Sequence, residues 1–229
     1  MKSPLVLAPL FHVGPVSVTT PVVVTWLLMA ALAGGAWLAT RRLALKPSKT
    51  QTALEALVEA IDAQIAETMG VDPTPYRALI GSIFVFILAA NWIDLIPGLE
   101  PPTAHVETDA ALALIVLAAT LVYGVSARGW RGYLATFAEP SWVMIPLNLV
   151  EQITRTFSLI VRLFGNVMSG VFVIGIVLSL AGLIAPVPLM ALELVTGAVQ
   201  AYIFAVLATV FIGAAVGEGA KPRPIKEPS

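Results

Sequence analysis

A stripe of polar and small side chains follows one face of the apolar segment 147–182. It comprises Glu151, Arg155, Ser158, Arg162, Asn166 and Gly170. Successive members are three or four residues apart, a spacing that places them on one face of an α-helix. Uncharged residues run from Leu163 to Leu192, so Arg162 is predicted to lie deep in the apolar segment.

The charge on Arg162 is permanent, because a guanidinium group does not deprotonate at any pH that a protein meets. Burying an arginine centrally in a membrane helix costs roughly 3 kcal/mol on insertion scales. No acidic residue lies three or four positions away. The group cannot relay a proton, but it can attract or displace one. It therefore suits a membrane-embedded acidic residue that arrives from another subunit and must lose its ion there.

Three readings of Arg162 remain open at this level. It could work with another subunit in ion transport, bind an anionic substrate in a secondary transporter or channel, or pair with Glu193 or Asp94 in a structural clamp. Transporters often contain internal repeats, and we find no clear repeat. Glu193, Thr196, Gly197 and Gln200 share one face of the next apolar segment. Gln200 is expected to be a hydrogen-bonding partner, and Glu151 and Arg155 an i,i+4 ion pair.

The composition is that of a membrane protein. Of 229 residues, 58% are hydrophobic and 12% are charged, against about a quarter charged in soluble domains. The net charge of −1 gives no reason to expect nucleic acid as a partner. We find no cysteine, Walker A loop, nucleophile elbow or metal-ligand spacing. We therefore expect no metal, no cofactor and no enzymatic activity of the chain by itself.

The predicted fold class is an all-α membrane protein with five transmembrane helices and one interfacial amphipathic helix, in a single polytopic domain. The spans are expected at 22–40, 78–96, 110–127, 147–182 and 189–216, the interfacial helix at 48–69, an outer segment at 1–21 and a cytoplasmic tail at 217–229. The first span is read as a retained helix rather than a signal peptide, because Arg41 and Arg42 follow it as an anchor. Lys and Arg cluster in alternate connections, which predicts an outer N-terminus and a cytoplasmic C-terminus.

Some of the expected helices differ from an ordinary membrane span. The helix expected at 48–69 has an acidic polar face, whereas a helix that binds anionic lipid is typically basic. It is expected to meet water or a protein partner, or simply to pack on its own bundle. The segment 147–182 would form a helix about 54 Å long, although about 20 residues cross the bilayer. The last two helices are therefore predicted to form a long, tilted hairpin.

Several motifs resemble subunit a of the rotary F-type ATP synthases. They are FSLIVRLFGNVMSG (157–170), LVTGAVQAYIFAVLATVF (194–211), NWIDLIPG (91–98) and IPLNLVEQ (145–152). The resemblance covers nearly the whole chain and is greatest to the alternate or N-type branch. It implies a non-catalytic subunit of the F0 sector in the bacterial inner membrane. The implied partners are the lipid bilayer, the ring of c subunits, the b-type subunits of the peripheral stalk, and the translocated H⁺ or Na⁺.

The resemblance also implies roles for individual residues. Arg162 matches the essential arginine that faces the carboxylate of the c-ring, and Asn166, Gln200 and Glu193 match residues on the ion path. The candidates for an outer half-channel are Asp94, His105, Glu107 and Asp109, and those for an inner half-channel are Glu151, Arg155 and Ser158. The chain departs from many relatives at Val171, where they carry an ionisable residue. The sequence leaves proton against sodium open, because the ion-selecting carboxylate lies on the c subunit.

Overall fold

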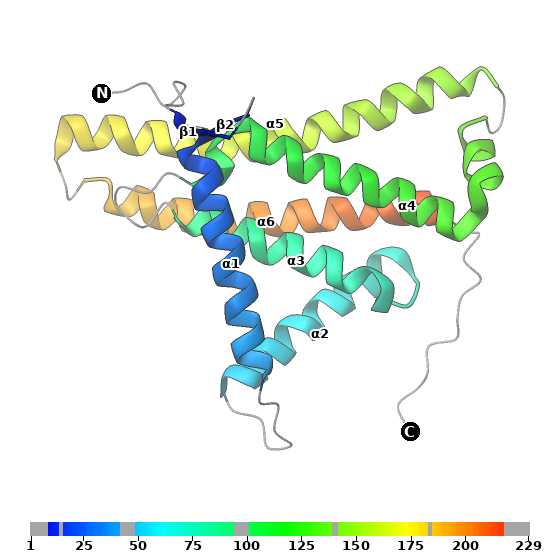
Figure 1. Ribbon diagram of the computed structural model, residues 1–229, viewed down its shortest axis with the longest axis horizontal. Helices are drawn as coiled ribbons and strands as arrows, with labels where there is room; N and C mark the ends of the chain where they lie inside the picture. Colours follow the sequence, from blue (N-terminus) through cyan, green and yellow to red (C-terminus); the bar gives the residue numbers. More distant parts are fainter. Residues whose placement is uncertain are drawn as a thin grey trace.

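The computed structural model describes residues 9–13, 16–41, 49–93, 101–138, 142–182 and 185–217. Its long helices are α1 (Thr20–Thr40), α2 (Lys49–Met69), α3 (Thr74–Trp92), α4 (Val106–Ala138), α5 (Met144–Ala181) and α6 (Val187–Val216) (Figure 1). All of these except α2 are long and apolar enough to cross a membrane. The predicted class, an all-α membrane protein with five spans, is confirmed.

The last two helices form the long hairpin that the sequence predicts. At about 1.5 Å per residue, the 38 residues of α5 and the 30 residues of α6 extend roughly 57 Å and 45 Å. Both exceed the hydrocarbon thickness of about 30 Å. Figure 1 shows them side by side along the long axis of the view, while α1 crosses them steeply. If α1 spans the bilayer, the hairpin lies obliquely within it.

Helix α4 is two helices joined at Gly129, a residue with φ of 73°. This left-handed conformation is open to glycine because it has no Cβ. The span expected at 110–127 therefore begins earlier and is followed by a short helix that sequence reasoning missed. Arg128 holds the bend by donating hydrogen bonds to Val216 O and Thr136 Oγ1, both at 3.1 Å.

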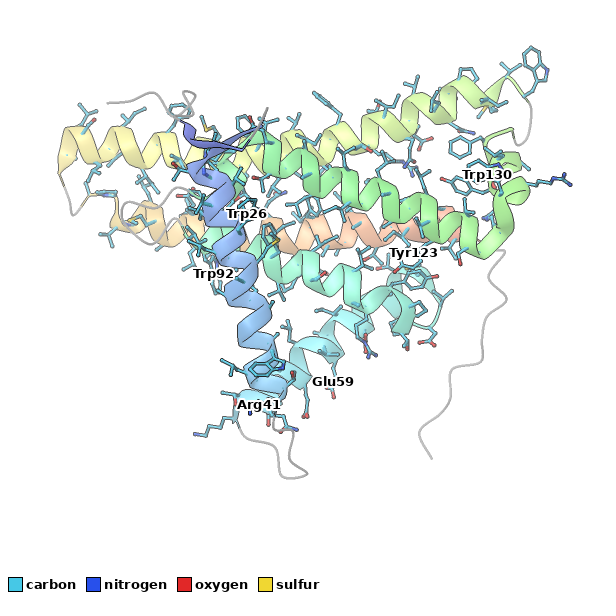
Figure 2. All side chains as sticks on the ribbon, in the orientation of Figure 1. Trp26, Arg41, Glu59, Trp92, Tyr123 and Trp130 are labelled. Atoms are coloured by element: carbon cyan, nitrogen blue, oxygen red, sulfur yellow. The ribbon has the colours of Figure 1, made fainter. Side chains whose placement is uncertain are left out.

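Helix α6 is central, because α2, α3, α4 and α5 all pack against it. One core cluster brings together Ile87, Val116, Leu163 and Phe204 from four helices. A second cluster joins α2 to the same bundle through Ile65, which is fully buried. The polar face of α2 stays exposed, and Figure 2 labels Glu59 on it.

Helix α3 begins and ends a few residues earlier than the sequence predicts. The span expected at 78–96 begins at Thr74, whose backbone N–H donates to Asp72 Oδ1 at 3.0 Å, and it ends at Trp92.

Asp94, residues 1–8, Ser48 and residues 218–229 lie outside the described residues. In the expected N-terminal segment, β1 (Pro9–Val13) and β2 (Val16–Thr19) form an antiparallel pair that the sequence did not lead us to expect.

Candidate functional site

Arg162 lies exposed on α5, whereas Leu163 and Val167 are buried on another face of the same helix. Within the described part of the chain, it makes no hydrogen bond or ion pair. A side-chain carbon added at the neighbouring Gly165 would meet nothing within 4 Å. The surface around the guanidinium group is therefore low and open, as close approach by another helix requires.

Glu193 lies against Gly170 rather than against Arg162. A Cβ added at Gly170 would stand 3.0 Å from Glu193 Oε2 and closer still to Oε1. Gly170 is eight residues beyond Arg162, which is about 12 Å along the helix. The clamp between Arg162 and Glu193 does not form in the described residues, and Asp94 lies outside them.

Hydrogen bonds connect three elements at the end of α3. Thr103, in the short helix η2 (Pro102–Ala104), donates to Asn91 Oδ1 at 2.7 Å, and Asn91 Nδ2 donates to Gly197 O at 3.0 Å. Trp92, labelled in Figure 2, donates from Nε1 to Leu194 O at 3.2 Å. Gly197 permits this approach, because an added Cβ would lie 3.0 Å from the Cβ of Asn91. Sequence reasoning did not assign roles to Asn91 and Thr103.

Acidic and basic side chains continue from η2 into the first turn of α4. His105 and Asp109 are buried, with 7% and 0% of their surface exposed, whereas Glu107 is exposed. Asn91, Thr103, His105 and Asp109 are called the η2 cluster below. Burying four polar side chains within an apolar bundle is unfavourable unless they have partners or a task.

A second polar region lies near the start of α5. It is a cavity of about 360 Å³ between α4, α5 and α6, and we call it the α5 cavity. Its lining comprises Thr120, Tyr133, Thr136, Phe137, Asn148, Glu151, Gln152, Arg155, Phe211, Ala214 and Ala215. The lining does not include Ser158, which is exposed on α5.

The predicted pair between Glu151 and Arg155 forms in this cavity. The guanidinium carbon of Arg155 also lies 5.3 Å from the ring centroid of Phe211 on α6, within cation–π range. These contacts bind Arg155 to its own bundle and set it apart from Arg162. The two arginines of the stripe therefore have different surroundings.

The contacts between α5 and α6 give the order of these features along the hairpin. Arg155 stacks on Phe211 at one end, and Gly170 meets Glu193 at the other. Arg162 falls between these two points on α5. A fixed cation with no partner among the described residues thus lies between two separate polar regions of the bundle.

Known proteins resemble the chain over most of its length. The family described as "ATP synthase A chain" matches residues 22–213 of the chain. The chain belongs to this family. "ATP synthase subunit a 2" of Bradyrhizobium is 56% identical over 96% of this chain and 99% of the relative. "ATP synthase subunit a" of Albidiferax ferrireducens is 45% identical over 92% of each chain. "ATP synthase subunit a 1" of Chlorobaculum parvum is 46% identical over 90% of this chain and 92% of the relative.

Membership of the ATP synthase A-chain family confirms the resemblance seen in the motifs. The family consists of non-catalytic subunits of the F0 sector, so the chain is a multi-pass membrane subunit and not an enzyme by itself. Its assembly includes a c-ring and other ATP synthase subunits.

Proposed function

We propose that the chain is the stator ion channel of a rotary ATP synthase and that Arg162 separates two half-channels. The observation that carries the proposal is the exposed guanidinium group, which has no partner in the described residues and lies between the η2 cluster and the α5 cavity. A permanent cation at this point stabilises an ionised carboxylate on the passing c-ring. It also repels a cation that would cross directly from one half-channel to the other.

Each polar region supplies one half-channel in this proposal. The η2 cluster, with Asp94, Glu107 and Glu193, forms the outer one. The α5 cavity, with Glu151, Arg155 and Ser158, forms the inner one. Asn166 and Gln200 lie along the ion path near the ring. The N-terminus is outside and the C-terminus is in the cytoplasm of a bacterium, with the chain in the inner membrane and b-type subunits of the peripheral stalk as further partners.

The exposed face of α5 supports the c-ring as the partner of Arg162. Phe157, Val161 and Phe172 are exposed on the same helix, so exposed apolar side chains occur both before and after Arg162 along α5. A partner with an apolar surface and one carboxylate covers the exposed apolar side chains of α5 and pairs with the cation of Arg162.

The test is ATP-driven ion pumping by the complete complex in membrane vesicles, measured for Arg162→Ala. We expect the variant to assemble with the c-ring and to lose pumping. Arg131→Ala is the matched control, because it removes an exposed arginine of the short helix after Gly129 that the proposal does not place on the ion path, and we expect it to retain most pumping. Pumping by the assembled Arg162→Ala complex would refute the proposal. Measuring both H⁺ and ²²Na⁺ flux in wild-type vesicles identifies the ion.

A further inference from the structure

Asp109 is a buried acid whose carboxylate has no hydrogen-bond donor in the described part of the chain. None of its surface is exposed, and neither Oδ1 nor Oδ2 accepts a hydrogen bond from a described residue. An isolated ionised carboxylate is very unfavourable in such surroundings, so the group binds a proton or meets water. A purely structural side chain at this position would be expected to find a donor.

The packing of α4 on α6 shows which residue of α6 lies at the same depth in the bundle as Asp109. Gly124 faces Ala215, since an added Cβ would lie 3.2 Å from the Cβ of Ala215. One turn earlier on each helix, Thr120 and Phe211 line the same cavity. The two helices run parallel, and both pairs have the same offset in residue number. The same offset places Asp109 level with Gln200.

Gln200 carries a buried hydrogen-bond donor that has no acceptor among the described residues. It is 7% exposed, and its Nε2 atom donates to no described residue. A buried amide donor and a buried acid without donors therefore lie at one depth on neighbouring helices. Each would be costly to leave unsatisfied, by about 1–3 kcal/mol for a neutral group.

The depth of Asp109 and Gln200 in the bundle is close to that of Arg162. On α6, Gln200 lies between Glu193, which meets Gly170, and Phe211, which meets Arg155. The antiparallel course of α5 and α6 brings Gln200 to the stretch of α5 between these contacts, where Arg162 and Asn166 lie. Asp109 is thus at the end of the η2 cluster that is nearest in depth to the fixed cation.

We propose that Asp109 is a proton-holding site of the outer half-channel and exchanges its proton with water at the level of Gln200. The proposal rests on the proposed function. An oxygen of the carboxylate gains a proton from a hydronium ion that arrives through the η2 cluster, and the O–H bond later breaks to return the proton to water beside Gln200. The step needs no other reactant. The charged or titratable groups on the near parts of the segments packed around it are His105, Glu107, Glu193, Arg162 and Tyr202, of which Tyr202 donates a hydrogen bond to Gln64. Helix α1 contributes none, and the other such groups of α3, α4 and α5 lie at the far ends of these helices.

The test compares Asp109→Asn with Glu59→Gln in the assembled complex. Glu59→Gln removes an exposed acid on α2 that the proposal does not place on the ion path, and Asp109→Asn removes the buried acid. We measure proton pumping while the pH on the outer side is varied. We expect Asp109→Asn to reduce the rate by roughly 100-fold, in the range typical of a lost proton-transfer group. The remaining rate should depend less on outer pH, and Glu59→Gln should resemble the wild type.

A normal rate and pH profile in Asp109→Asn would overturn the inference. A slower rate with an unchanged pH profile would also overturn it, because that result indicates a structural role. If Asp109→Asn fails to assemble, Asp109→Glu decides: it keeps an acid, so it should pump with a shifted pH profile, and an unshifted profile contradicts us. Pumping by Arg162→Ala would refute the proposed function separately. Transport of Na⁺ with no proton flux in the wild type would overturn the assignment of Asp109 alone.

Discussion

The contact between Gly170 and Glu193 predicts a sharp effect of one methyl group. In Gly170→Ala, the new Cβ would overlap the Glu193 carboxylate, at a separation that real Cβ atoms do not show. The carboxylate must move by about 1 Å or more, and a displacement of that size in a functional group can reduce a rate by about 100-fold. Alanine itself favours the helix by about 1 kcal/mol over glycine. A loss of ion pumping would therefore report the displaced Glu193 rather than a weakened α5.

Gly175→Ala is the matched control, because an added Cβ at Gly175 meets nothing within 4 Å. We expect this variant to pump normally and to be as stable as the wild type or more so. The assay is ATP-driven pumping in vesicles, normalised to the amount of assembled complex. Shortening the acid by one methylene in Gly170→Ala with Glu193→Asp should restore part of the rate. Equal pumping by the two alanine variants would show that the position of Glu193 against Gly170 has no part in ion flow.

Two further predictions concern how the bundle is held together. Arg77 donates to both carboxylate oxygens of Asp62, joining α3 to α2. Because the pair is partly exposed, we expect Asp62→Asn to destabilise the purified complex by about 0.5–1 kcal/mol, and Asp62→Arg with Arg77→Asp to recover part of this in thermal unfolding. An unchanged unfolding midpoint in Asp62→Asn would show that the pair contributes nothing. Asn91→Leu should destabilise the complex more, by about 2–3 kcal/mol, because it leaves Thr103 and Gly197 without their buried partner. Its control is Ser82→Ala, at an exposed site on the same helix. Equal stability of the two variants would contradict this account.

Much of the fold could be predicted from the sequence because membrane crossing is a local property. About 20 apolar residues must form a helix in a bilayer, where the backbone has no water to bond. The lengths of α5 and α6 predicted their oblique course in the same way. The short helix after Gly129 and the pairing of β1 with β2 were missed. A lone glycine does not reveal its φ angle, and two short strands carry little periodic signal.

The sequence by itself determined the polar stripe on α5, the pair between Glu151 and Arg155, and the isolation of Arg162 from acids on its own helix. Each of these depends on spacing along one helix, which the chain fixes directly. Only the tertiary structure decided that Glu193 lies against Gly170, that Asn91 connects η2 to α6, and that Asp109 is buried. These relations depend on how separate helices are aligned along one another. That alignment is set by the packing of many apolar side chains at once, and no short motif encodes it.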